Sequence, residues 1–276
     1  MIDLHLHTTA SDGALAPAEL VRRAAAAGLT TISVTDHDTI AGLGDATTAA
    51  RELGLTCIPG LEITAVEGDR DVHVLGYFFD PDASALGSFL KAQRADRVRR
   101  VHEMCDRLAA AGLDIRADSV FSAPLDADER SIGRPAIADA LVRAGFVRDR
   151  DEAFERLIGR GGPAYVPRRG VTVGEVVEII TAAGGIASLA HPVLAGLDHL
   201  VPELARIGLA ALEARHSDHA PAVEARYRAM AAELSLAISG GSDYHGDHTA
   251  NGASLGVVTL DAADYAGLES RAHARH

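Results

Sequence analysis

The sequence of 276 residues contains no tryptophan, two cysteines and a single lysine, Lys91. Cys57 and Cys105 lie far apart, which argues against a disulfide framework or a thiolate zinc site, so we expect both in the core. No apolar run approaches the roughly 20 residues that span a membrane, and no basic segment followed by an apolar one indicates a secretory signal. We therefore expect a cytoplasmic protein with no membrane partner.

Aromatic residues are also few, and the net charge is not positive. Six Phe and five Tyr predict no platform on which successive bases could stack. The formal net charge is −13, and affinity for long nucleic acid comes mainly from basic side chains that neutralise phosphates. We therefore expect no stable binding of long nucleic acid.

Short apolar runs alternate with helical patterns along most of the chain. Pro17–Ala27 and Ile40–Leu53 show helical spacing of apolar residues, and each is followed by glycine. This rhythm predicts an α/β fold with mostly parallel strands, either a barrel or a doubly wound sheet. The expected strands are Ile2–His7, Thr31–Thr35, Thr56–Pro59, Val72–Phe78, Ile186–Ala190, Leu209–Glu213, Leu236–Ser239 and Gly256–Leu260.

The rhythm is interrupted in the middle of the chain, where helical patterns dominate over Leu86–Ala111, Arg134–Ala144 and Asp151–Ile158. We interpret residues 85–170 as a helical insertion that covers the site of a discontinuous barrel formed by residues 1–84 and 171–262. Residues 263–276 are expected to be a C-terminal tail that frays.

Histidines and carboxylates gather at the ends of the expected strands. His5 and His7 are two residues apart in the first strand, so both rings point to one face. In parallel α/β folds the loops after the strands converge on one face, and one cation takes about three protein ligands. Nine candidates thus predict two or three metal ions. The candidates are His5, His7, Asp12, His37, Glu62, His73, His191, Asp243 and His245.

The order of these motifs resembles the PHP (polymerase and histidinol phosphatase) family. Further stretches are similar to the bacterial branch that contains nucleoside 3′,5′-bisphosphate phosphatases: Gly133-Arg134-Pro135, Ala164-Tyr165-Val166-Pro167 and Glu213 to His219. The motifs are His-x-His-Thr-x-x-Ser-Asp-Gly from His5, Thr-Asp-His-Asp from Thr35, Gly-x-Glu from Gly60, the strand residue His73, His191-Pro192, and Ser-Asp-x-His from Ser242.

The resemblance implies a distorted seven-stranded β/α barrel of TIM-barrel type with a metal centre at the carboxyl ends of its strands. His5 and His7 would share one metal ion with Asp243. Glu62 would bridge to a second ion held by His73 and His191. The third position would belong to Asp12, His37 and His245. Some family members have histidine at the position of Asp12, and a carboxylate there suits manganese or iron better than zinc. Manganese is therefore expected, with zinc or iron as alternatives.

The implied activity is metal-dependent hydrolysis of a phosphate monoester by metal-activated hydroxide, of the phosphatase type. The expected substrate is a small nucleotide, most specifically the 3′-phosphate of a nucleoside 3′,5′-bisphosphate. Histidinol-phosphate phosphatase and 5′-to-3′ exonuclease on short RNA are the alternatives, followed by a non-catalytic module that binds metal or phosphate. The sequence indicates no general acid.

Two residues are expected to bind the substrate. Arg134 offers planar, paired donors for phosphate in the Gly-Arg-Pro motif, and His219 matches a family position near the substrate, with His216 as a close competitor. Arg168 and Arg169 are expected in a solvated turn.

The basic run Arg94, Arg97, Arg99 and Arg100 is expected on a solvated helix face with ion pairs. Asp3, Asp36 and Asp38 are expected to orient metal-bound imidazoles as hydrogen-bond partners.

Overall fold

The computed structural model describes residues 1–121, 129–247 and 254–274. It contains a seven-stranded sheet in which the strands follow one another in chain order, β1 to β7. Four neighbouring pairs are parallel, whereas β4 is antiparallel to both β3 and β5. The strands are β1 Ile2–Leu6, β2 Thr31–Val34, β3 Thr56–Glu67, β4 Arg70–Tyr77, β5 Ile186–Leu189, β6 Ala211–His216 and β7 Ala237–Gly241.

The sheet closes almost completely into a barrel. Leu6 at the end of β1 forms a parallel bridge with Tyr244, and the His7 amide donates to the Tyr244 carbonyl at 3.0 Å. Gly241 lies so close to β1 that a Cβ there would fall 2.4 Å from the His5 nitrogen. The expected α/β fold and seven-stranded distorted barrel are therefore confirmed.

Two predicted strands differ from the structure. The third runs on past Pro59 to Glu67, because it forms a tight antiparallel hairpin with β4 through Gly68, which has a φ of 62°. The eighth expected strand, Gly256–Leu260, is wrong. Only Leu260 pairs there, in an isolated bridge with Ile2, because the stretch begins in a turn with Gly256 at a φ of 78°.

Helices surround the barrel. Apolar faces of α1 and α2 cover β1 and β2 through a shared cluster with Leu20, Val21 and Ile32. The other helices of the barrel part are α7, α8, α9 and α10, with a short 3-10 turn before α9. Their bounds are α1 Pro17–Ala26, α2 Leu43–Leu53, α7 Val173–Ala182, α8 Pro192–Ala195, η2 Asp198–Leu200, α9 Val201–Ile207 and α10 Pro221–Glu233.

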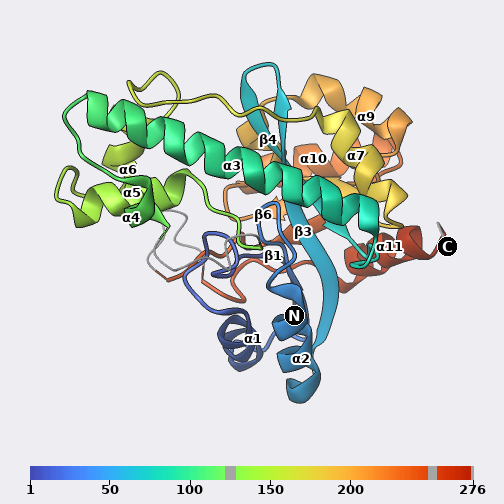
Figure 1. Ribbon diagram of the computed structural model, residues 1–276. Coiled ribbons are helices and arrows are strands. Elements are labelled where there is room, and N and C mark those ends of the chain that lie inside the picture. The colour runs from blue at the N-terminus through green and yellow to red at the C-terminus, as the bar shows by residue number, and fades with distance from the viewer. Residues whose placement is uncertain (122–128, 248–253, 275–276) are drawn as a thin grey trace.

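The middle of the chain is helical: α3 crosses in front of β3 and β4, and α4, α5 and α6 lie beside the C-terminal half of α3 (Figure 1). These helices have an apolar cluster of their own, which includes Met104, Leu108, Ile137 and Leu141. This cluster supports our proposal that residues 85–170 form an insertion. The elements are α3 Ser84–Ala110, α4 Ala117–Val120, α5 Arg134–Arg143, α6 Arg150–Ala153 and the π-helical turn η1 Phe154–Ile158.

The C-terminal segment is ordered against the barrel. Helix α11 spans Ala262–His273, and its Leu268 and Ala272 are buried in one cluster with Ile2 and Leu4 of β1. The expectation that this segment frays is therefore wrong over the helix, because it supplies part of the core. No helix among the described residues is long and apolar enough to cross a membrane.

Candidate metal centre

The barrel brings the predicted ligands together from six separate segments of the chain. His5 is buried in β1 with His7 directly after it, Glu62 lies in β3 and His73 in β4. His191 follows β5, and the segment after β7 provides two more residues. His191 and Asp243 have positive φ values of 26° and 54°, a conformation that non-glycine residues seldom adopt and that is often found at functional sites.

Glu62 stands at the centre of the cluster, and its side chain is almost completely buried. Its Oε2 atom lies 3.0 Å from His37 Nδ1, 3.3 Å from His7 Nε2 and 3.4 Å from His5 Nε2. Its Oε1 atom lies 2.8 Å from His73 Nδ1 and 3.2 Å from His191 Nε2. One carboxylate thus faces five imidazoles with two different oxygens, as a bridge between two cations would require.

Two further carboxylates complete the cluster. Asp243 Oδ1 lies 3.1 Å from His7 Nε2 and 3.3 Å from His5 Nε2. Asp12 Oδ1 lies 3.2 Å from His245 Nε2, and Asp12 Oδ2 lies 3.7 Å from His37 Nε2. All nine predicted ligands are therefore adjacent in one continuous cluster.

The cluster fits divalent cations. Several of its buried polar atoms have no hydrogen-bond partner, among them His5 Nε2, His7 Nε2 and Glu62 Oε2. Ligand atoms placed tetrahedrally at about 2.1 Å from a cation are about 3.4 Å from one another. The separations around His5, His7, Glu62 and Asp243, 3.1 to 3.4 Å, match that spacing.

Among the described residues, ligand atoms within 4.8 Å of one another define four groups that could hold a metal ion. Eight of the nine predicted ligands occur in these groups. His191 adjoins them through Glu62, 3.2 Å from its Nε2, and through ring contacts with His5 and His73. The groups are His7, Asp12, His37 and His245; His5, His7, Glu62 and Asp243; His37, Glu62 and His73; and His5, Glu213 and His216.

The proximity of opposite charges shifts the pKa values strongly. Burial of the Glu62 carboxyl opposes its ionisation, but the surrounding imidazoles outweigh burial and hold its pKa well below the usual value. Burial likewise disfavours a charged His7, but Asp243 and Glu62 outweigh it and raise the pKa of His7 to about 10. Without a bound cation, protonated imidazole rings balance the negative charge of the carboxylates.

Sequence reasoning missed Glu213 and His216 of β6 as members of the cluster. Glu213 is fully buried, and its Oε1 atom lies 2.9 Å from His5 Nδ1. The sequence contained a signal for Glu213, because Glu213 is the last residue of the expected strand Leu209–Glu213, as His7 is of Ile2–His7.

The three carboxylates expected to orient imidazoles have other contacts. Asp3 accepts from the backbone amides of His5 and Ser242, and Asp36 accepts from Thr8 and Ser11. Asp38 pairs with two arginines. Their contacts are thus with backbone, hydroxyl and guanidinium groups, and they organise the loops that present the rings.

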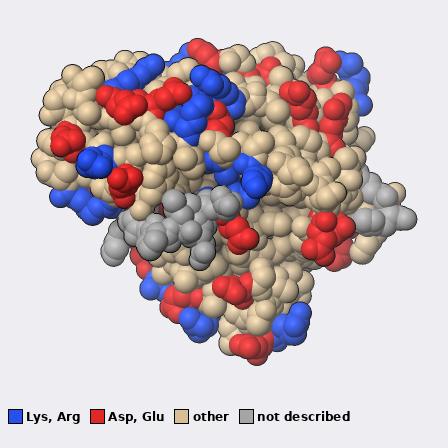
Figure 2. Space-filling view, in the orientation of Figure 1, with Lys and Arg blue, Asp and Glu red and all other residues tan. Residues whose placement is uncertain are grey.

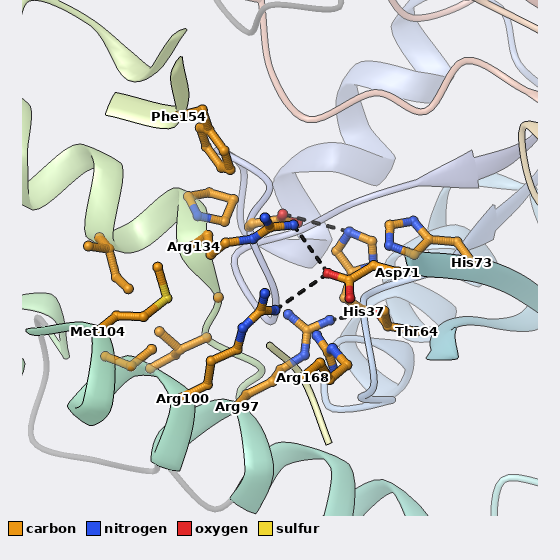
Figure 3. Close-up of a pocket in the computed structure, with 16 residues that line it drawn as sticks. His37, Thr64, Asp71, His73, Arg97, Arg100, Met104, Arg134, Phe154 and Arg168 are labelled. Atoms are coloured by element: carbon orange, nitrogen blue, oxygen red, sulfur yellow. Dashed lines mark hydrogen bonds and ion pairs between the residues drawn. The ribbon is translucent and has the colours of Figure 1, made fainter. Parts of the chain in front are cut away.

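A cavity of about 200 Å³ opens beside the cluster, between α3, α5 and the strand ends. Arg134 lines it together with Arg97, Arg100 and Arg168, and Asp12, His37 and His73 form its wall toward the cluster. Figure 3 shows the four arginine side chains near Asp71, whose Oδ2 atom is 3.2 Å from Arg134 and 3.4 Å from Arg100.

The burial of three of these arginines differs from the sequence-based expectations. Arg97 and Arg100 are buried rather than solvated, because they lie on the same face of α3 as Leu90 and Met104. Arg168 is also buried, with its guanidinium 3.1 Å from Asp38, so it does not lie in a solvated turn. Arg99 of the run shows the expected ion pairs along a helix face, with Asp96 and Glu103.

His219 does not line this cavity. Its Nδ1 atom is 2.8 Å from the Ala214 carbonyl, which makes Nδ1 the donor and leaves Nε2 as an acceptor without a partner. Its ring packs against His216 at the edge of the cluster. The structure thus brings Arg134 close to the cluster on one side, while His219 adjoins it through His216.

The barrel with this centre defines the chain as a metal-dependent phosphoesterase, and comparisons with known proteins give its family. The model of the PHP domain matches residues 3–131. The 3′,5′-nucleoside bisphosphate phosphatase of Chromobacterium violaceum is 33% identical over 88% of this chain and 87% of its own. The 5′-3′ exoribonuclease of Haemophilus influenzae is 39% identical over 69% of this chain and 68% of its own. The chain belongs to the PHP family.

A solved structure agrees with that assignment. A crystal structure from Bifidobacterium adolescentis, assigned as a metal-dependent phosphoesterase, superimposes with a TM-score of 0.89 at 34% identity and covers 98% of this chain and 96% of its own. The fold of this chain is therefore the same as that of the B. adolescentis protein along nearly its whole length.

Proposed function

We propose that this phosphoesterase removes the 3′-phosphate from nucleoside 3′,5′-bisphosphates. The observation that carries the proposal is the arginine-lined cavity beside the metal cluster. A substrate with one phosphate at the cluster and a second in the cavity would use both. The C. violaceum relative, a 3′,5′-nucleoside bisphosphate phosphatase, agrees with this substrate class.

The charge of the cavity favours a second anionic group. Arg97, Arg100, Arg134 and Arg168 pair with two carboxylates, Asp38 and Asp71, while Asp12 on the cavity wall lies beside His37 and His245. The guanidinium groups therefore exceed their counterions, and guanidinium binds phosphate through paired hydrogen bonds. A neutral nucleoside, or a lone phosphate bound at the metal cluster, would leave the excess positive charge of the cavity without a counterion.

The nine predicted ligands would hold two or three divalent cations. When bound, such cations activate water as a nucleophile and offset the charge of the phosphoryl group. The carboxylate of Asp12, next to His37 and His245, favours manganese or iron over zinc. The protein's own contribution is to position the phosphate ester, through Arg134 on the cavity side and His219 at the edge of the cluster.

Exonuclease activity on short RNA is the second candidate, because the H. influenzae relative is a 5′-3′ exoribonuclease. The small cavity and the surface charge favour the smaller substrate. Among the described residues on the face in Figure 2, acidic and basic side chains are interspersed and form no continuous basic track that would guide a long strand. Histidinol-phosphate phosphatase is less favoured, since that substrate has one phosphate.

Phosphate or nucleotide release from a panel of substrates, measured after reconstitution with manganese, distinguishes the two candidate functions. The panel contains adenosine 3′,5′-bisphosphate, 3′-AMP, 5′-AMP, histidinol phosphate and a 5′-phosphorylated RNA trinucleotide. We expect the highest kcat/KM for the bisphosphate. A higher kcat/KM for the trinucleotide, or an equal one for 3′-AMP, would overturn the substrate assignment.

A further inference from the structure

The innermost layer of the cluster is formed by two side chains of β6, Glu213 and His216, which lie behind His5 and Asp243. Both are buried, at 0% and 3% exposure. They form a possible metal-binding group with His5, so their role is either to bind a cation or to hold the other ligands. The hydrogen bonds decide between these roles.

Glu213 uses both of its oxygens within the protein. Oε1 lies 2.9 Å from His5 Nδ1, and Oε2 accepts from the His191 backbone amide at 2.7 Å. A carboxylate at Nδ1 keeps the proton on that nitrogen, which leaves the Nε2 lone pair of His5 directed at Glu62 and Asp243. Glu213 thus joins the ring of one predicted ligand to the backbone of another.

The proton on His216 can be placed in the same way. Its Nδ1 atom accepts from the Asp218 amide at 3.1 Å, so in the neutral ring the proton is on Nε2. Nε2 lies 3.5 Å from Asp243 Oδ2, on the opposite side of that carboxylate from His5 and His7, which face Oδ1. A protonated Nε2 cannot ligate a cation, but it can orient Asp243.

We propose that Glu213 and His216 are positioning residues: Glu213 fixes the tautomer of His5 and the position of His191, and His216 fixes the orientation of Asp243. The group on β6 is then a support for the metal centre rather than an additional metal site. This inference rests on the proposed metal centre and not on the choice of substrate.

The test is manganese binding to the full-length protein, by calorimetric titration and by metal content per chain. Glu213→Gln keeps the shape of the side chain but has one acceptor oxygen for two donors. We expect its manganese affinity to fall by about 10- to 100-fold, the usual effect of losing such a partner, with the wild-type stoichiometry regained at saturating manganese. His216→Gln should weaken binding less, because its contact is longer.

Tyr77→Phe is the matched control. It removes another buried hydrogen bond of the barrel, from the Tyr77 hydroxyl to the Leu4 carbonyl at 3.0 Å, next to His5 in the chain. We expect a similar small loss of thermal stability with unchanged manganese affinity. If Glu213→Gln failed to fold, Glu213→Asp and His216→Gln would be measured in its place, with the same expected weakening.

Three results would overturn the proposal. Unchanged affinity in the folded β6 variants would leave Glu213 and His216 with a structural role only. A metal equivalent that is not regained at saturation would make Glu213 itself a ligand. Equal weakening in Tyr77→Phe would trace the effect to stability. Failure of the wild-type protein to bind manganese would instead contradict the metal centre itself.

Discussion

Arg134 is the residue on which recognition of a second phosphate should depend most. Its guanidinium lies in the cavity, against Asp71 and over the ring of Phe154. Arg134→Gln should lower kcat/KM for adenosine 3′,5′-bisphosphate by about 10- to 100-fold, the cost of losing one or two charged hydrogen bonds to phosphate, and should affect 3′-AMP much less. Arg143→Gln, at the exposed end of the same helix, is the control and should change kcat/KM for neither substrate. Equal losses for both substrates would contradict the assignment.

His7 should make manganese binding depend on pH. Its pKa is raised to about 10 by Asp243 and Glu62 against the effect of burial, so the ring is protonated at pH 7 in the metal-free protein. A histidine that binds a metal ion must be neutral, and binding must therefore release a proton. We expect calorimetric titrations in buffers of different ionisation enthalpy to show release of at least one proton, with affinity that rises from pH 6 to pH 8. Affinity independent of pH would contradict this.

At the scale of elements, α11 belongs to the core, although its sequence suggested a loose end. Leu268 is completely buried against the strand that presents His5. Leu268→Ala should lower the free energy of unfolding by about 2 to 5 kcal/mol through lost burial and a cavity. Leu53→Ala, at the exposed end of α2, should change it by less than about 0.5 kcal/mol. Denaturant unfolding measures both, and a similar small effect of both would mean that α11 packs loosely.

The elements also show which parts of the fold were predictable. The helices Pro17–Ala26 and Leu43–Leu53 and most strands follow from local periodicity and glycine stops. The antiparallel β3–β4 hairpin and the docking of α11 depend on contacts between distant segments, which periodicity does not encode. For the same reason Arg97 and Arg100 were misjudged: a basic run on a helix is usually solvated, and only tertiary packing against Asp38 and Asp71 buries it.

At the scale of the whole molecule, the barrel gathers residues that are up to about 240 positions apart in the chain around Glu62. All nine predicted ligands meet there: most lie at or just after the end of a strand, whereas Glu62 and His73 lie within the β3–β4 hairpin. Glu213 and His216 were missed since a single glutamate or histidine in a strand has many structural uses, and their role is visible only from the hydrogen bonds they make behind the ligands.

Phosphate ester hydrolysis by this protein should depend on metal ions bound by the histidine and carboxylate cluster. The most direct measurement is phosphate release from adenosine 3′,5′-bisphosphate by chelator-treated protein, before and after addition of manganese, with metal content determined in parallel. We predict that wild-type activity is lost with the metal and restored by manganese. Asp243→Ala should bind less manganese and remain at least about 100-fold less active, with its fold intact. Full activity without metal, or unchanged activity and metal content in Asp243→Ala, would contradict the account.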